Sequence, residues 1–131
     1  MIHRKHNYLI INFFINLKDL IEKEGINLET DKFTIQCDDL ESIIAEINRE
    51  VDNLSRYTEN TGKVIVLIGE RYYFRIESNL AATIIIDRIN DNQYQIVIVS
   101  AGGKQGLMGI TWGAERSMLK RIKDIFLNYV Y

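Results

Sequence analysis

Apolar residues recur at helical spacing in three stretches of the chain, at about residues 5–24, 39–57 and 112–130. The middle stretch is the most regular and carries acidic residues on its opposite face; Asp38 or Asp39 is expected to cap it. Its apolar stripe comprises Leu40, Ile43, Ile44, Ile47, Val51 and Leu54. The stripe of the last stretch comprises Met118, Leu119, Ile122, Ile125, Phe126 and Tyr129. The pattern predicts three helices.

The expected first helix is apolar around most of its circumference. Leu9, Ile10, Phe13, Leu17, Leu20 and Ile21 form a stripe, and Ile11, Phe14 and Ile15 widen it. A helix that is apolar nearly all round is buried on more than one side. We therefore expect it to pack between other elements or to lie in a subunit interface.

The segments between these helices read as strands. Residues 32–37 alternate and predict a short strand or extended connection, and residues 56–62 form a polar break. Four runs follow at 63–69, 71–77, 80–89 and 94–101, joined by links too short for a crossover, which makes them antiparallel. The expected fold class is α+β in a single domain, 1–131: two N-terminal helices (about 1–60), then a four-stranded antiparallel meander with a C-terminal helix packed on it (about 62–131).

A two-residue turn at Asp91 and Asn92 would place Arg88 opposite Gln95 and Ile86 opposite Val97. With Ile76 opposite Ala81, one sheet face would carry Tyr72, Phe74, Ile76, Ile85, Ile89, Tyr94, Ile96 and Ile98 as the core. The other face would carry Arg71, Tyr73, Arg75 and Arg88 among Ile84, Ile86, Val97 and Val99. Tyrosine and arginine on a sheet can stack on and neutralise a phosphorylated ligand or nucleic acid. Alternatively, the first helix or a second subunit covers its aliphatic centre; a one-residue slip in register would exchange the faces.

Composition fits an ordinary globular domain: 47% of residues are apolar and 26% charged, with a net charge of −2. Residues 1–61 hold seven basic and twelve acidic residues, and residues 62–131 hold nine and six. The single cysteine, Cys37, excludes an intrachain disulfide and suits a reducing, cytoplasmic compartment as a small buried hydrophobe. The apolar run from Tyr8 to Leu17 is shorter than the roughly 20 residues of a membrane span, so no membrane association is expected.

Residues 100–113, SAGGKQGLMGITWG, hold five of the eight glycines and join a strand to a helix. Backbone N–H groups and a helix N-terminus at such a junction can bind phosphate. The candidate ligand-binding residues are Gly102, Gly103, Lys104, Gly106, Trp112, Glu115 and Arg116, with Arg71, Tyr73, Arg75 and Arg88 from the sheet. No established phosphate-binding motif is present, and the loop follows a meander rather than a βαβ unit. The alternative is a purely structural connection whose glycines let Trp112 fold back onto the core.

The last helix carries Arg116, Lys120, Arg121 and Lys123 away from its apolar stripe. Such a face can follow a phosphate backbone, but more often it is solvated or pairs with an acidic neighbour such as the second helix. Nucleic acid is therefore the less favoured partner. His3 and His6 are the only histidines, so a catalytic triad and a metal site are not expected, and no cofactor is implied. Glu115 could act as a general base, although acids are common in a first helical turn.

RYYFRIES at 71–78 and SAGGKQGLMGITWGAE at 100–115 resemble a family of short, uncharacterised bacterial proteins, a domain of unknown function. The resemblance covers about residues 64–120. The sequence departs from the family pattern at Arg116, where an acidic residue is expected. The resemblance implies no activity and no functional residue.

From these features we expect a small, non-enzymatic cytoplasmic module that acts by protein association and forms a homo-oligomer. A binder of a small anionic ligand or nucleotide at the loop from Gly102 to Gly106 is the alternative. Nucleic-acid binding through the basic last helix is the second alternative.

Overall fold

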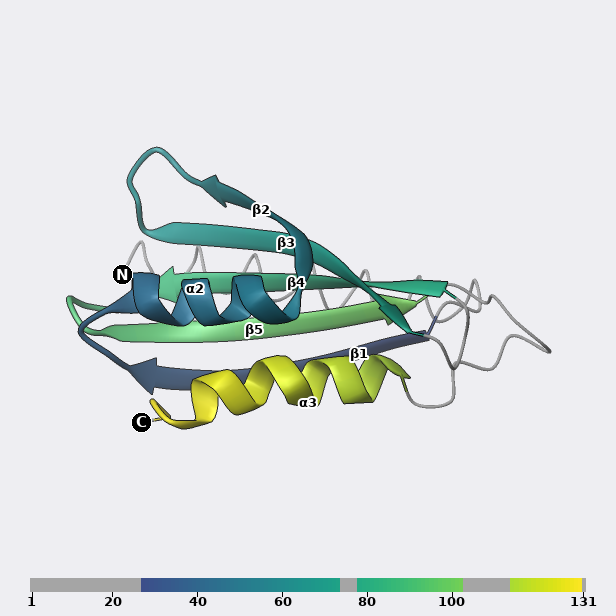
Figure 1. The fold of residues 1–131 in the computed structure, drawn as a ribbon. Helices are drawn as coiled ribbons and strands as arrows, with labels where there is room; N and C mark the ends of the chain where they lie inside the picture. Colours follow the sequence, from purple (N-terminus) through teal and green to yellow (C-terminus); the bar gives the residue numbers. More distant parts are fainter. Residues whose placement is uncertain (1–26, 74–77, 103–113, 131) are drawn as a thin grey trace.

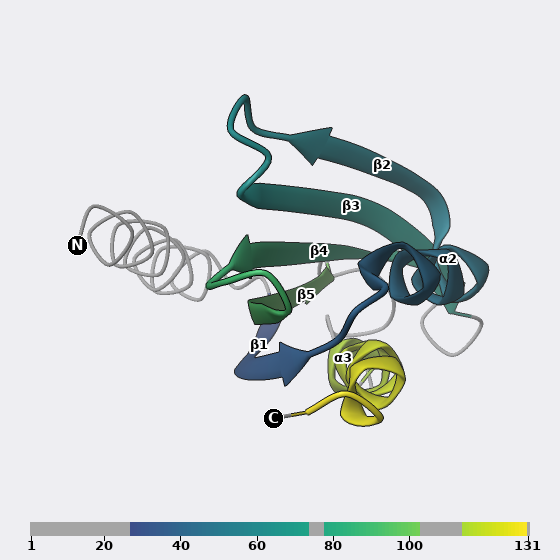
Figure 2. The ribbon, with the colours of Figure 1, turned by 90° about the vertical axis from the view of Figure 1, so that its left-hand side faces the viewer.

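The computed structural model describes residues 27–73, 78–102 and 114–130. Within these ranges the protein is an α+β domain of two layers, a five-stranded antiparallel sheet and two helices (Figure 1). The strands are β1 (Asn27–Gln36), β2 (Asp52–Thr58), β3 (Val64–Tyr73), β4 (Ser78–Arg88) and β5 (Gln93–Gly102). The helices are α2 (Leu40–Glu50) and α3 (Ala114–Leu127), and both lie on the same face of the sheet (Figure 2). The predicted fold class is confirmed, while the expected helix at 5–24 lies outside the described residues.

The sheet order is β1-β5-β4-β3-β2, so β2 to β5 form a meander and β1 joins it beside β5. The core lies between the sheet and the two helices. Fully buried side chains from the sheet meet those from the helices, with Phe33 of β1 edge-on to Phe126 of α3. The predicted apolar stripes of the two described helices supply much of this core, including Ile43, Ile47, Met118 and Ile122.

The second helix is shorter than predicted. Asp39 caps it, accepting hydrogen bonds from the Ser42 backbone N–H at 3.2 Å and the Ser42 hydroxyl at 2.6 Å. The prediction of a helix to residue 57 is wrong, because the chain leaves α2 at Glu50 and enters β2 at Asp52. Asn53 adopts a positive φ of 52° at a register shift between Asp52 and Ser55. Asparagine tolerates this conformation better than most residues, so the sharp corner forms there.

The predicted runs at 63–69 and 71–77 are not two strands. Residues 64–73 form β3 without a break, and Gly69 lies inside it. A Cβ atom at Gly69 would lie 2.3 Å from Val51 Cγ1 and 3.1 Å from the Asp52 carbonyl oxygen. The glycine therefore marks a close backbone approach at the corner between α2 and β2, not the end of a strand.

Residues 32–37, predicted as a short strand, belong to a strand that begins earlier, at Asn27, and pairs along its whole length with β5. The outer edge of β1 is closed at one end by the chain after α3: Gln36 donates its N–H to the Tyr129 carbonyl at 2.8 Å, and Ile35 forms a bridge with Val130. The remainder of the strand carries three charged residues, Glu29, Asp31 and Lys32. Edge strands protected in these ways resist pairing with other chains.

The predicted registers are wrong. Arg88 lies opposite Tyr94, Ile86 opposite Ile96 and Ile84 opposite Ile98, one residue away from the prediction. Asn90 organises the hairpin by accepting hydrogen bonds from the backbone N–H groups of Asn92 and Gln93, and this longer turn shifts the pairing. The expected pairing of Ile76 with Ala81 would place Tyr73 opposite Ile84, but Tyr73 pairs with Ser78, so this register is also wrong.

The corrected registers change the two faces. Ile84 and Ile86 join Tyr94, Ile96 and Ile98 beneath the helices, whereas Ile85 shares the opposite face with Val97 and Val99. We call this opposite side, away from α2 and α3, the back face. It also carries Val64, Val66, Ile68 and Asp87.

Candidate functional site

The predicted site lies at the junction between β5 and α3, and the structure describes the two ends of this junction. Gly102 is the last residue of β5 and Ala114 the first of α3. Gly103, Lys104, Gly106 and Trp112 lie outside the described residues, as does Arg75. Only the backbone of Tyr73 is described, at the end of β3.

Gly102 leaves no room for a side chain. A Cβ atom there would lie 2.4 Å from Leu80 Cδ2 and 3.0 Å from Glu115 Oε1. Leu80 is completely buried and belongs to the core. This tight packing is a structural reason for glycine at position 102.

Two buried polar side chains lie close to this junction. Glu115, in the first turn of α3, is 3% exposed, and Ser100 of β5 is fully buried. Ser100 Oγ finds no hydrogen-bond partner in the described part of the chain. Ser100 forms a row of small residues with Ala82 and Gly69 on the helix-facing side of the sheet. A row of small side chains lets the helices approach the sheet closely.

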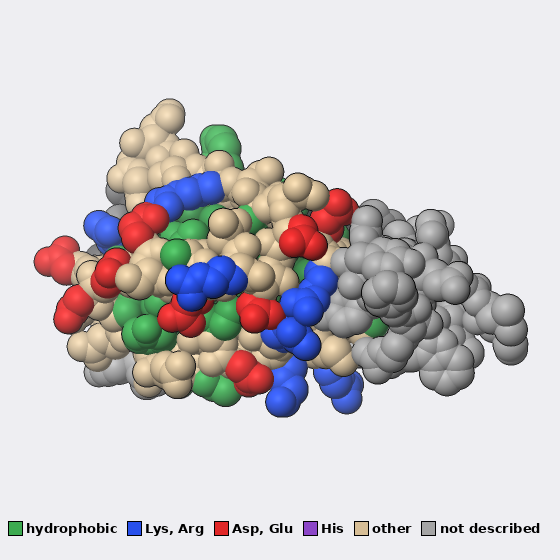
Figure 3. Space-filling model, viewed as in Figure 1, with side chains coloured by type: hydrophobic (Ala, Val, Ile, Leu, Met, Phe, Trp, Pro, Cys, Tyr) green, Lys and Arg blue, Asp and Glu red, His purple; other side chains and the backbone are tan. Residues whose placement is uncertain are grey.

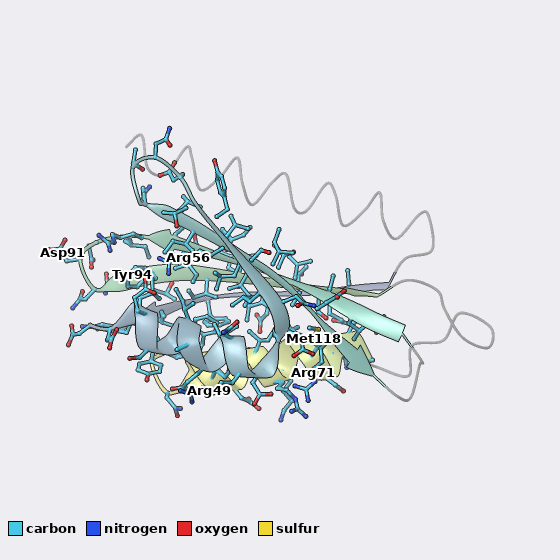
Figure 4. All side chains as sticks on the ribbon, turned by 45° about the horizontal axis from the view of Figure 1, so that its top comes forward. Arg49, Arg56, Arg71, Asp91, Tyr94 and Met118 are labelled. Carbon is cyan, nitrogen blue, oxygen red and sulfur yellow. The ribbon has the colours of Figure 1, made fainter. Side chains whose placement is uncertain are left out.

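Arg71 is held at the same end of the sheet by contacts within the domain. It pairs laterally with Leu80, the neighbour of Gly102. Its guanidinium group donates to the Glu50 carbonyl oxygen at 2.9 Å and to Glu50 Oε2 at 3.0 Å. Figure 4 shows Arg71 at the end of the sheet away from Asp91, which lies in the hairpin between β4 and β5.

Glu50 joins three elements, since Arg121 of α3 also donates to its Oε2, at 3.1 Å. These hydrogen bonds, first from Arg121 and then from Arg71, lower the pKa of the Glu50 carboxyl below its ordinary value. Another ion pair joins α2 to the sheet. Arg56 of β2 donates to the Glu41 carboxylate of α2 at 2.7 Å, and this hydrogen bond lowers the pKa of Glu41.

The predicted basic residues do not form one cluster. Arg88 lies eight residues along β4 from Leu80, about 26 Å at the usual strand rise. There its guanidinium lies 5.7 Å from the centre of the Tyr94 ring. Arg116 is exposed and lies 3.6 Å from Glu29 of β1. The structure thus brings Gly102, Glu115, Arg116 and Arg71 to one end and leaves Arg88 at the other.

The basic residues of α3 have acidic partners in the described domain. Arg116 pairs with Glu29, Lys120 with Asp124, Arg121 with Glu50 and Lys123 with Asp31. Figure 3 shows positive and negative side chains interspersed over the surface that α2 and α3 present. The expectation that this face pairs with acidic neighbours, including one on the second helix, is confirmed.

Two surface features were missed from the sequence. Tyr57 of β2 and Ile68 of β3 are 67% and 50% exposed, and both point to the back face. On the same face Asp87 is 4% exposed and lies 3.7 Å from Lys63 Nζ. A charged residue inside the apolar run at 80–89 was the available signal for Asp87, whereas Tyr57 was hidden by its assignment to a helix.

Cys37, just after β1, is buried as predicted. Burial, followed by the negative charges of Asp38 and Asp39, raises the pKa of its thiol. Among the described residues, no group of three or more His, Cys, Asp or Glu side chains is placed to hold a metal ion. No helix in the described ranges has the length and hydrophobicity that crossing a membrane requires.

No curated protein matches the sequence. One family model matches residues 30–130, from β1 through α3, which is further in both directions than the resemblance at 64–120. That span covers both helices and nearly all of the sheet. The chain therefore belongs to the family of unknown function DUF6054.

Proposed function

We propose that this domain is a small non-enzymatic association module that binds a second copy of itself through the outer edge of β2. The observation that carries the proposal is the exposure of Tyr57 and Ile68 next to that edge. Every other residue of β2 except Leu54 is also exposed, and within the described ranges the strand pairs on one side only, with β3.

The main chain of β2 can accept another strand. Glu59 donates its N–H to the Val64 carbonyl oxygen at 3.0 Å, which continues the ladder between β2 and β3 beyond Thr58. Because hydrogen-bonding pairs alternate along an antiparallel ladder, the N–H and C=O groups of Arg56 and Thr58 face away from β3. Unpaired groups of this kind are a ready template for an additional strand.

Pairing of two β2 strands about a two-fold axis perpendicular to the sheet would join two domains into one continuous sheet. The back faces of both copies would then lie on the same side, and the two Tyr57 side chains would be neighbours. Such an isologous contact buries the same surface on both chains. The exposed apolar area around Tyr57 and Ile68 would supply the hydrophobic part of the interface.

Sedimentation equilibrium of the full chain tests this proposal. We expect a dimer, and at least a tenfold higher dissociation constant for Tyr57→Ser and for Ile68→Ser. Leu127→Ser is the matched control, because Leu127 is a 49% exposed apolar residue on α3, away from β2. A monomer at the highest soluble concentration, or equal weakening by Leu127→Ser, would contradict the proposal.

The anionic-ligand hypothesis at the loop from Gly102 to Gly106 stays a prediction, because most of that loop lies outside the described residues. In the described part, the paired Arg71 and Arg116 and the distant Arg88 give it no added support.

A further inference from the structure

The back face of the sheet is buried in one part and exposed in another. Ile85 is 3% exposed, and Val64 and Val99 are each 6% exposed. Ile68 and Tyr57, on the same face near the β2 edge, are 50% and 67% exposed. The buried residues therefore lie along the β3, β4 and β5 part of the face, away from its open edge.

No described element accounts for this burial. Val64, Ile85 and Val99 are buried but do not belong to the core cluster beneath the helices. Both α2 and α3 lie on the other face (Figure 2). Side chains on an uncovered sheet face keep their tips in water, as Ile68 does, so the burial of the three aliphatic residues calls for a cover that the described elements do not supply. A second copy is not needed to bury them, since these exposures are those of a single chain.

The short segments outside the described ranges cannot reach the whole area. Residues 74–77 join Tyr73 to its partner Ser78 at one end of the sheet. Residues 103–113 begin and end at that same end, beside Gly102. Asp87 and its partner Val64 lie seven residues from Leu80 along the strands. A segment that left this end of the sheet, reached them and returned would cover about 46 Å, at about 3.3 Å per residue. Eleven extended residues span at most about 40 Å.

We propose that residues 5–24 pack as a helix across the back face, along β4 and β5, with their N-terminal end next to Asp87. These residues carry the apolar stripe formed by Leu9, Ile10, Phe13, Leu17, Leu20 and Ile21. A helix of that length is about 30 Å long. The ten-residue strand β1 is about 33 Å long, so the helix matches the length of the sheet.

The direction of the helix follows from where the chain enters the sheet. β1 begins at Asn27, which lies opposite Gly102, and runs toward Gln36, opposite Gln93. A helix that precedes Asn27 and runs along the sheet therefore has its C-terminal end near Gly102 and its N-terminal end near the hairpin. Asp87 is buried at the hairpin end.

Charge supports the same direction. The basic residues Arg4 and Lys5, flanked by His3 and His6, lie at the N-terminal end of this segment. Positive charge at that end of the helix would lie close to the Asp87 carboxylate, alongside Lys63. A buried carboxylate is stabilised when cationic partners surround it. The exposed region near Tyr57 stays outside the covered area.

Photo-crosslinking of the full chain tests the cover and its direction. The benzophenone amino acid p-benzoylphenylalanine is placed at Gln95 or at Ala101, two half-buried back-face positions of β5 at opposite ends of the sheet. We expect Gln95 to link to residues near 3–9 and Ala101 to residues near 20–26. The probe at the exposed Tyr57 is the control and should give no link to residues 5–24 of its own chain.

Mixing ¹⁴N- and ¹⁵N-labelled chains separates links within a chain from links between copies. Links within one chain, in the expected order, support the proposal. Links only between copies, links to residues 103–113, the reverse order, or no link from either site would overturn it. A link from Tyr57 to a second copy bears on the β2 interface alone, so the two proposals can fail separately.

A second measurement avoids any change in the sheet. Phe13→Asp in the full chain should raise the fluorescence of bound anilinonaphthalene sulfonate several-fold, because it would uncover Ile85, Val64 and Val99. The neighbouring polar position supplies the control, and Asn12→Asp should leave the signal unchanged. Equal signals from both variants would count against the cover.

Discussion

Val51 occupies the space that a side chain at position 69 would need, with its Cγ1 atom 2.3 Å from the point where a Cβ on Gly69 would lie. Val51 is 1% exposed and ends α2, while Gly69 lies in the middle of β3. The corner that joins α2 to β2 is therefore seated directly on the backbone of β3.

Replacing Gly69 with alanine should destabilise the domain by about 1–3 kcal/mol, the usual cost of overpacking a rigid site. The free energy of unfolding from urea titration gives the measurement. In a Val51→Ala background the added cost of Gly69→Ala should be smaller, because the nearest clashing atom is gone. Equal costs in both backgrounds would mean that the contact with Val51 does not limit position 69.

Ser100→Ala should leave the stability unchanged or increase it. The Ser100 hydroxyl is fully buried and has no hydrogen-bond partner in the described part of the chain. Removing a buried, unpaired polar group while keeping a small side chain removes a desolvation cost. Ser55→Ala, at an exposed position of β2, is the control, and thermal unfolding is the measurement. A clear loss of stability for Ser100→Ala alone would show that this hydroxyl has a partner.

The carboxyl of Glu50 makes the stability depend on pH in a defined direction. Its pKa is lowered from the ordinary value of 4.5 by Arg121 and Arg71. The folded state therefore binds the proton more weakly than the unfolded state, so the contribution is complete above pH 4.5 and is lost as the pH falls further. The pair is partly exposed, which limits its contribution to about 1 kcal/mol or less.

Glu50→Gln should therefore reduce stability near neutral pH and have a smaller effect in acid, where wild-type Glu50 is protonated. Urea titrations on both sides of pH 4.5 supply the comparison. Glu46→Gln, on the same helix but without an ion pair in the described ranges, should not change the pH profile. The same loss at both pH values for Glu50→Gln would argue against the ion pairs.

The Cys37 thiol should react with Ellman's reagent only when the domain opens. It is 7% exposed, and its raised pKa keeps it protonated at neutral pH. Thiolate is the reactive form of cysteine, so burial and protonation both slow the reaction. Labelling in denaturant is the reference for full reactivity. A native protein that reacts as fast as the denatured one would place Cys37 at the surface.

The sequence pattern was sufficient where one periodicity dominated. The stripes of α2 and α3, the Asp39 cap and the buried Cys37 followed from spacing and turn chemistry alone. It failed where helical spacing continued by coincidence: Val51 and Leu54 fit the stripe of α2, yet both pack around Gly69 from a corner and a strand. Asp52 and Asn53 were the local indication of a break, and only the tertiary contact made the break decisive.

The registers could not be derived for a different reason. In a hairpin, one additional turn residue moves every side chain to the opposite face, and the Asn90 side chain selects the longer turn. The prediction of the candidate site was limited by the same uncertainty in strand pairing. The sequence grouped Arg71, Arg88 and Glu115 in one candidate site, and the separation of Arg88 from the other two depends on pairing that composition does not determine.

The two edges of the sheet are not equivalent, and the difference has a consequence for the proposed assembly. The edge at β1 is closed at one end by Tyr129 and Val130 and carries charges along its length, whereas no described residue pairs with the outer edge of β2. A domain with two open edges could add strands at both sides and polymerise into a fibre. Because the β1 edge is protected by these contacts and charges, each copy would be joined through β2 alone, and the proposed pairing would terminate at two chains.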